Sequence, residues 1–339
     1  MTARVTPKER IGRFLSGQPT DFVPCVPLIL NHSARVLGVK VSRYATDGET
    51  MGRANVAAYR RYGQDLITIF TDTCIVAEAM GTTLHFPDDD VARVKTPVVA
   101  EPGDAAKLRR VDVHTAGRLP VYLGAIRHCV SEVGDEVFVS CCIPAPFSNA
   151  AALRGTATLA RDLYKNPGLA HALLEKSLEV INDMSEAIAQ AGGIPVLVDP
   201  VASGSVLSRK TFEEFAMPYL KRALGKNKSL GMVPILHICG KTASIVDLMA
   251  KTGAAALSLD QIELADAVER TGGAVCLMGT VRPAETLLGG TPETVRQEAA
   301  RCLAAGKRNP GGFILSSGCE VPIETPPANV DALIAAARA

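Results

Sequence analysis

The second half of the chain alternates between short apolar runs and longer segments whose hydrophobic positions lie three or four residues apart. The five apolar runs cover residues 194–199, 232–237, 255–259, 274–279 and 312–316. Continuous apolar character predicts strands that are covered on both faces, and the amphipathic segments between them predict helices. This half is therefore expected to form βαβ units around a parallel sheet.

The first half is less regular, but it adds three expected strands, FVPCVPLIL (22–30), DLITIF (65–70) and EVFVSCC (136–142). Amphipathic segments at 48–63 and 117–134 predict the intervening helices. Eight parallel strands that alternate with helices predict a single (β/α)8 TIM barrel. We expect this barrel to be one domain over residues 1–339. Residues 82–99 do not fit the alternation and predict a β-hairpin excursion after the second strand.

Composition narrows the function classes. The formal net charge is +1, with acidic and basic residues mixed along the chain, which argues against a nucleic-acid or membrane-surface partner. The apolar runs are far shorter than the roughly 20 residues of a membrane helix, and the start is unlike a signal peptide. We therefore expect a cytoplasmic protein with no membrane association. In a reducing compartment the nine cysteines are not expected to form disulfides.

The carboxyl ends of the expected strands carry the candidate chemistry, because barrel active sites form there. His237 and Cys239 follow the fifth strand, and Cys319 follows the eighth. Alternation along an extended chain places residues i and i+2 on one side. Two thiolates and an imidazole suit zinc with a fourth position left for a reactant. The same spacing also fits a buried histidine and two structural cysteines.

Four segments carry a resemblance to a known family, and they are LHICGKT (236–242), the stretch 199–222, SSGCEVPIETPPANVDAL (316–333) and FTDTCIVAEAMG (70–81). They resemble the uroporphyrinogen decarboxylase superfamily. Within it, the chain is similar to the zinc-dependent methylcobalamin:thiol methyltransferases, typified by methylcobamide:coenzyme M methyltransferases. The resemblance begins at TPKERIGRFLSG (6–17) and covers nearly the whole chain. It implies a barrel of the decarboxylase type and zinc bound by His237, Cys239 and Cys319.

The chain also departs from the decarboxylases of this superfamily. They carry an arginine-rich loop near the start, where this chain has LNHSARVLG (30–38) with the single Arg35, and a histidine where this chain has Cys319. A substrate with many carboxylates needs several guanidinium partners. The resemblance therefore favours a corrinoid-dependent methyltransferase that moves a methyl group from methylcobalamin, held by a partner corrinoid protein, to a zinc-activated thiol such as coenzyme M. A thiol becomes the nucleophilic thiolate when it is coordinated to Zn²⁺.

Three alternatives stay open at this point. Tetrahydrofolate is an alternative methyl acceptor, although an amine gains little from a zinc that deprotonates thiols. A uroporphyrinogen decarboxylase-like lyase is disfavoured by the missing arginines. A non-catalytic module that docks a corrinoid protein is disfavoured by an intact set of three metal ligands.

Four further polar residues are candidates. Asp72 occupies the position whose equivalent serves the decarboxylase reaction, and it is expected either to contact the cofactor or to have a structural role. Asp199 and Ser203 follow the fourth strand and are expected to contact corrinoid or substrate, with Asp199 also a catalytic candidate; loop hydrogen bonding is the alternative for both. Glu78 is a catalytic candidate whose carboxylate would fill the open position of zinc before substrate arrives.

The segment after Cys239 suggests how an acceptor is recognised. Gly240, Lys241 and Thr242 are expected at the start of a helix, where free N–H groups favour an anion. Arg282 follows the seventh strand at the neighbouring rim. We expect the negative tail of an acceptor thiol to lie near Lys241 or Arg282, unless both are solvated surface charges. His32 is expected to be a hydrogen-bonded loop histidine.

Overall fold

The sheet at the centre of the molecule is parallel and has seven strands. The computed structural model describes residues 5–339, so the first four residues of the expected domain lie outside it. The strands follow the order β1-β4-β5-β6-β7-β8-β9 and are all paired in parallel. Their bounds are β1 (Leu66–Ile69), β4 (Phe138–Pro144), β5 (Ile194–Val198), β6 (Ile235–Lys241), β7 (Ala256–Gln261), β8 (Cys276–Val281) and β9 (Phe313–Ser317).

An irregular segment, residues 24–26, lies between β9 and β1 and closes the curled sheet. The N–H of Val26 donates to the carbonyl of Leu315 at 2.8 Å, and the N–H of Asp65 donates to the carbonyl of Cys25 at 2.9 Å. The expected first strand is thus reduced to one bridge, between Cys25 and Leu315. Pro24 and Pro27 lack the N–H groups that a longer ladder needs. The TIM-barrel class is confirmed, with this strand as its irregular member.

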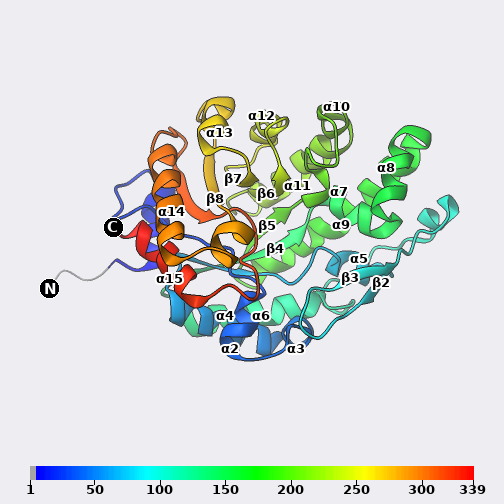
Figure 1. Cartoon of the computed structure of the whole chain (residues 1–339). Coiled ribbons are helices and arrows are strands. Elements are labelled where there is room, and N and C mark those ends of the chain that lie inside the picture. Colours follow the sequence, from blue (N-terminus) through cyan, green and yellow to red (C-terminus); the bar gives the residue numbers. More distant parts are fainter. Residues whose placement is uncertain (1–4) are drawn as a thin grey trace.

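Helices surround the sheet in chain order, from the blue helices α2–α4 to the red helix α15 (Figure 1). Their bounds are α1 (Pro7–Leu15), α2 (His32–Leu37), α3 (Val41–Thr46), α4 (Gly48–Tyr62), α5 (Ile75–Ala79), α6 (Leu119–Val133), α7 (Pro146–Arg154), α8 (Thr156–Lys165), α9 (Pro167–Gln190), α10 (Arg209–Thr211), α11 (Met217–Ser229), α12 (Val246–Ala250), α13 (Leu264–Thr271), α14 (Pro292–Gly306) and α15 (Pro327–Ala337). Local signals set the ends of α4, where Asp47 accepts a hydrogen bond from the N–H of Thr50 and Gly63 ends the helix with φ 67°. Among residues 5–339, no helix combines the length and the apolarity that crossing a bilayer requires.

Apolar side chains fill the interior of the barrel in two layers. The layer at the amino ends of the strands contains Ile11, Val26, Leu66, Ala256, Cys276, Met278 and Ile314. The layer nearer the carboxyl ends contains Leu28, Leu30, Phe70, Cys142, Val196 and Val198. The barrel is therefore a packed core rather than a pore, and the polar residues collect above the second layer.

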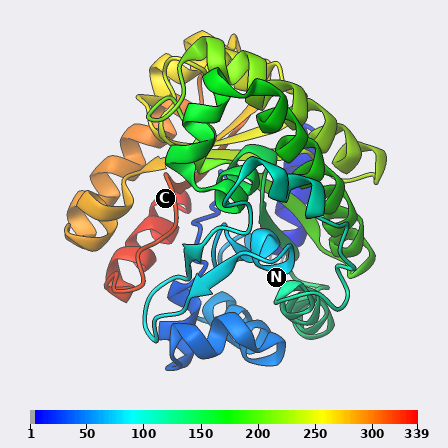
Figure 2. The ribbon, with the colours of Figure 1, turned by 90° about the vertical axis from the view of Figure 1, so that its right-hand side faces the viewer.

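The expected hairpin is present. Strands β2 (Thr83–His85) and β3 (Arg93–Thr96) pair antiparallel after β1. The hairpin extends from one side of the molecule in Figure 1 and faces the viewer in Figure 2. Its Asp88 binds Lys40 beside α3, and the ring of Phe86 lies 4.5 Å from the guanidinium carbon of Arg118. The hairpin thus covers a buried ion pair near the carboxyl end of β1.

Candidate metal centre

Three metal-ligating side chains meet at the carboxyl side of the barrel. The donor atoms of His237, Cys239 and Cys319 all lie within 4.8 Å of one another. His237 and Cys239 belong to β6, and Cys319 stands two residues beyond β9. Strands β7 and β8 separate β6 from β9 in the sheet, so the curvature of the barrel brings the ligands together. The structure therefore unites the three residues that were expected to meet.

The ring of His237 is buried, and one hydrogen bond sets its orientation. Its Nδ1 lies 3.0 Å from Oγ of Ser258, which stands directly beside it on β7. Its Nε2 is 3.7 Å from Sγ of Cys319. A hydrogen bond at one ring nitrogen commonly directs the other nitrogen of a metal-ligating histidine toward the metal. Nε2 is therefore the ring atom presented to the two thiols.

The two cysteines are partly buried, and each changes the acidity of the other. A hydrogen bond from Cys319 lowers the pKa of Cys239, whereas the same contact and burial raise the pKa of Cys319 well above its ordinary value. Zinc bonds of about 2.0–2.3 Å at tetrahedral angles place ligand atoms about 3.5 Å apart, close to the spacing between His237 and Cys319. The donor chemistry and the geometry thus both fit a zinc ion.

The loop after β5 packs against the backbone that follows Cys239. A Cβ atom at Gly240 would lie 2.9 Å from the hydroxyl oxygens of both Ser203 and Ser205, and Gly240 has φ 74°. The hydroxyl of Ser203 also accepts a hydrogen bond from the N–H of Ser205 at 3.1 Å. Ser203 therefore lies beside the metal-ligand segment and bonds within its own loop. Its expected contact with corrinoid or substrate stays a prediction.

Asp199 is fully buried beside the histidine strand. Its backbone N–H donates to the carbonyl of His237 at 2.9 Å. Its Oδ1 accepts from the N–H and the hydroxyl of Ser148 at 2.7 and 2.6 Å, whereas Oδ2 has no partner among the described residues. Burial raises the pKa of Asp199 to about 7. One carboxylate oxygen therefore holds the side chain in place, and the other is free to accept a hydrogen bond from a ligand. The catalytic or cofactor-binding role of Asp199 stays a prediction.

Asp72 and Glu78 both bind Arg118, a residue that sequence reasoning did not select. Nη1 of Arg118 lies 2.9 Å from Asp72, and Nε lies 2.7 Å from Glu78. Asp72 also accepts a hydrogen bond from the N–H of Cys74 at 2.9 Å. Arg118 precedes the apolar helix α6, where the hydrophobic pattern gives no reason to bury a charge. Glu78 is not part of the described metal-ligand group, and its role as a fourth ligand stays a prediction.

Two more acidic residues near the centre were missed. Asp260, at the end of β7, accepts a hydrogen bond from the N–H of Gly240 at 2.9 Å. Glu320 follows Cys319 and accepts from the backbone N–H and the side-chain amide of Asn31 at 3.1 and 2.8 Å. Burial raises the pKa of Glu320 to about 7. Both residues stand at expected strand ends. That position, which had already selected the three candidate metal ligands, was the signal that could have identified them.

The expected helix start after Cys239 is wrong. Strand β6 continues through Lys241, and α12 begins only at Val246 and is five residues long. The N–H of Lys241 donates to Ser205, and its side chain is exposed. Arg282 pairs with Glu298 at 3.1 Å. The structure therefore supplies no helix terminus at this place to bind the anionic tail of a substrate.

His32 is hydrogen-bonded as expected, but it is the first residue of helix α2 and not a loop residue. It is buried, and its Nδ1 lies 2.9 Å from the carbonyl oxygen of Ile323. Its Nε2 lies 2.8 Å from the hydroxyl of Tyr62. Both ring nitrogens are therefore satisfied within the protein, which leaves neither for a metal.

Comparison with known proteins gives a consistent result over nearly the full chain. Residues 6–339 match the family model described as uroporphyrinogen decarboxylase (URO-D). The chain is 28% identical to a methylcobamide:CoM methyltransferase, MtbA, from Methanosarcina acetivorans, over 98% of each chain. It is 24% identical to a uroporphyrinogen decarboxylase from Aliivibrio salmonicida, over 96% of this chain and 95% of that protein. A solved structure of a methyltransferase from Methanosarcina mazei covers 98% of each chain, with a TM-score of 0.89 and 26% identity.

Proposed function

Because its residues 6–339 match that model, the chain belongs to the uroporphyrinogen decarboxylase (URO-D) family, and we propose that it transfers a methyl group from a methylated corrinoid to a thiol such as coenzyme M. The observation that carries the proposal is the convergence of His237, Cys239 and Cys319 within 4.8 Å. Similarity to the methylcobamide:CoM methyltransferases of Methanosarcina supports it.

The proposed mechanism assigns separate tasks to the residues of the centre. His237 Nε2 and the two cysteine sulfurs would hold Zn²⁺, which supplies the positive charge that deprotonates an incoming thiol. Ser258 keeps the imidazole turned toward the sulfurs. The two cysteines contribute negative charge, which keeps the substrate sulfur nucleophilic. The substrate thiolate would then attack the methyl carbon, and the methyl–cobalt bond would break with its electron pair left on cobalt.

The surroundings of the centre suggest where the other reactants enter. The corrinoid is bulky and is proposed to arrive on a partner corrinoid protein at the carboxyl face of the barrel. Asp199, with one oxygen unpaired, and Ser203, beside Gly240, are proposed to contact the cofactor or the acceptor from the β5 side. Asp72 is bound to Arg118 and is proposed to shape that face without moving a proton.

The alternatives account less well for the same residues. A porphyrinogen decarboxylase needs several arginines for substrate carboxylates, but Arg35 pairs with Glu324, and Arg118 is buried between two carboxylates. A tetrahydrofolate acceptor is an amine and makes little use of two thiolates on a metal. A docking module has no use for three converged metal ligands.

The test offers methylcobalamin to the zinc-loaded protein with coenzyme M, homocysteine and tetrahydrofolate in separate reactions. We expect the methyl–cobalt absorption to disappear when a thiol is offered. In the Cys319→Ser variant the absorption should persist, because the methyl group is no longer transferred. The proposal would be overturned if the methyl group were transferred to tetrahydrofolate but to neither thiol, and at the same rate in zinc-loaded and zinc-free protein.

A further inference from the structure

Strand β7 touches all three of the segments that carry the candidate ligands. Its residues Ser258 and Asp260 are two positions apart and therefore lie on one side of the strand. Ser258 binds the ring of His237 at 3.0 Å, and Asp260 accepts the N–H of Gly240, the residue after Cys239, at 2.9 Å. A Cβ atom at Gly318, the residue before Cys319, would lie 2.8 Å from Oδ1 of Asp260.

The contact with Gly240 is made where the ladder between β6 and β7 is interrupted. The two strands pair through Ile238 and Leu259, and pairing resumes only at Lys241 and Gln261. An irregularity of this kind releases a backbone N–H from the ladder and redirects the neighbouring side chain. Here the released N–H is that of Gly240, and Asp260 receives it through Oδ2. The carboxylate thus fixes the backbone next to Cys239.

Asp260 also packs against Gly318, the residue that precedes the third candidate ligand, Cys319. A Cβ atom there would also lie 3.1 Å from Cα of Asp260, so any side chain at this position would push Asp260 or the turn aside. The N–H of Gly318 donates to the carbonyl of Val281 at 2.8 Å, which holds the turn onto β8. One carboxylate is therefore packed between the backbones that carry Cys239 and Cys319.

We propose that Asp260 is a positioning residue that sets the two cysteine segments in place so that both sulfurs face Nε2 of His237 before the metal binds. The proposal rests on the zinc site of the proposed function. Asp260 is not part of the described group of converging donor atoms, so its action is on the backbone of the ligands and not on the metal. Mutation of residues that support metal ligands in this way commonly lowers the affinity for the metal by about 10- to 100-fold.

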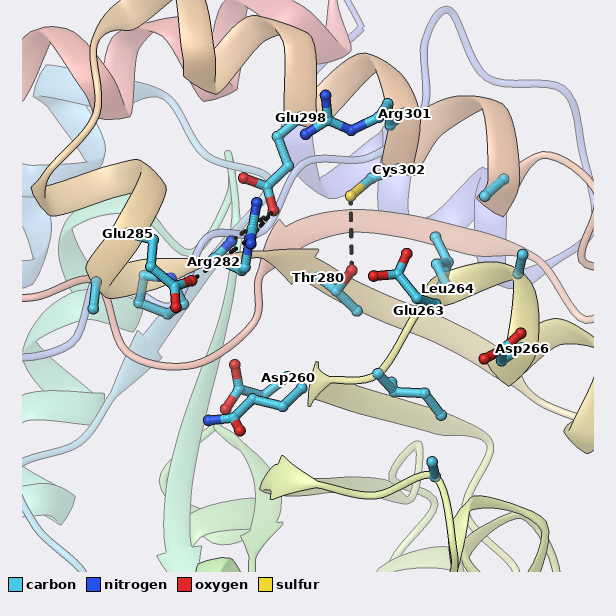
Figure 3. A pocket seen from close by; sticks show the side chains of 17 residues that line it. Asp260, Glu263, Leu264, Asp266, Thr280, Arg282, Glu285, Glu298, Arg301 and Cys302 are labelled. Atoms are coloured by element: carbon cyan, nitrogen blue, oxygen red, sulfur yellow. Dashed lines mark hydrogen bonds and ion pairs between the residues drawn. The ribbon is translucent and has the colours of Figure 1, made fainter.

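The surroundings of Asp260 leave its carboxylate available for this task. It lies at the edge of a cavity of about 860 Å³ that Arg282 and Glu298 also line (Figure 3). The guanidinium of Arg282 is 3.1 Å from Glu298, so the nearby arginine is engaged elsewhere. Asp260 is 9% exposed, and its carboxylate accepts the hydrogen bond from the N–H of Gly240. A charged acceptor makes such a bond shorter and stronger than a neutral one.

The test measures the zinc affinity of the full chain by competition with a chromophoric chelator, with no methyl transfer involved. Asp260→Ala should weaken zinc binding by about 10- to 100-fold. Asp260→Asn keeps an oxygen acceptor and should lose less. Glu263→Ala removes an acid from the same cavity and should change the affinity less than about twofold, as expected for a residue without a contact to the ligand segments.

A second variant guards against a chain that fails to fold without Asp260. Gly318→Ala retains the Asp260 side chain but forces its carboxylate away from the turn, so this variant should also weaken zinc binding. With Co²⁺ in place of zinc, saturated variants should keep the thiolate-to-cobalt absorption of the wild type, since both sulfurs still bind.

Three results would decide against the proposal in different ways. Wild-type affinity in both Asp260→Asn and Gly318→Ala would overturn it. A changed cobalt coordination spectrum in Asp260→Asn would overturn it as well, because the carboxylate would then bind the metal itself. A wild-type chain that takes up no zinc would remove the proposed function along with it, whereas the first two results leave that function intact.

Discussion

Two polar clusters lie near the carboxyl ends of the strands, and they are built in opposite ways. In the ion-pair cluster, Arg118 binds Asp72 at 2.9 Å and Glu78 at 2.7 Å, so the protein itself supplies both signs of charge. In the metal cluster, His237, Cys239 and Cys319 present donor atoms to one another, and no described side chain brings a cation among them. The first cluster is complete within the chain, and the second has room for a cation.

The difference separates structural burial from functional burial. A buried ion pair is balanced by its own partners, and removing one partner leaves an uncompensated charge. The guanidinium of Arg118 is nearly saturated, since only Nη2 lacks a partner and the Phe86 ring covers it. Converging cysteine ligands release their protons only when a metal binds, so such a site is completed by the metal and not by the chain. The two clusters should therefore respond to mutation in different observables, stability for one and metal affinity for the other.

The largest effect is expected from the cysteines. The purified chain should hold about one zinc, and Cys239→Ala or Cys319→Ser should lower the zinc affinity by more than about 100-fold and abolish methyl transfer. The thermal midpoint of the metal-free chain should change little, because a barrel of this size does not need a metal for its core. Zinc assay and calorimetry check both statements. The control is Cys302→Ala, which removes a buried cysteine that is hydrogen-bonded to Thr280. This variant should retain zinc.

Full zinc content in both cysteine variants would show that the ligands were assigned wrongly. Loss of zinc together with collapse of the metal-free fold would show that the two clusters do not differ as described, because the metal cluster would then be structural as well.

The second effect tests the ion-pair cluster. Arg118→Met should lower the free energy of unfolding by about 3–5 kcal/mol, because Asp72 would remain buried, and Glu78 half-buried, without a cation. Zinc affinity should stay within about twofold, since Arg118 makes no described hydrogen bond or ion pair with the candidate ligands His237, Cys239 and Cys319. Urea unfolding and chelator competition measure the two. Arg60→Met removes an exposed pair with Glu136 and should cost about 1 kcal/mol or less.

The sequence allowed much of the barrel to be predicted, because buried parallel strands leave continuous apolar runs. The expected strand 194–199 is β5 (Ile194–Val198), and 312–316 is β9 (Phe313–Ser317). The first strand was over-predicted, since an apolar run does not show that its prolines cannot pair. The three candidate metal ligands could be predicted because soft donors at strand ends are rare, and the structure brings their donor atoms within 4.8 Å of one another.

The supporting residues could not be found in the same way. The bond from Gly240 to Asp260 depends on an interruption of the ladder between β6 and β7, which local patterns do not reveal. The burial of Arg118 depends on two carboxylates that are 40 and 46 residues away in the chain. Such residues are common charged types whose role exists only once distant segments have come together.

A third, smaller effect concerns Glu78, which the ion-pair cluster holds and which was expected to reach the metal. Glu78→Gln should lower the free energy of unfolding by about 1–2 kcal/mol, through the lost charge on its bond to Arg118. Its zinc affinity decides between the two roles. We expect no change, because the carboxylate is 2.7 Å from the guanidinium. A clear loss of affinity with unaltered stability would assign Glu78 to the metal cluster and break the comparison.

The smallest effect sharpens the comparison within one residue type. His32 has both ring nitrogens bonded, whereas His237 keeps Nε2 directed at two sulfurs. Burial lowers the pKa of His32 below its ordinary value. The folded state therefore disfavours the protonated ring, so the contribution of His32 to stability is complete above the unfolded pKa of about 6.5 and is lost as the pH falls below it.

His32→Asn keeps a donor for Ile323 without a titrating ring, and its free energy of unfolding should fall less between pH 7.5 and 5.5 than that of the wild type. Urea unfolding at both pH values of the zinc-free proteins measures this difference, and carboxylates common to both chains cancel from it. Equal slopes would mean that His32 accepts a proton without disturbing its two hydrogen bonds, and a closed set of partners would then not be what separates it from His237.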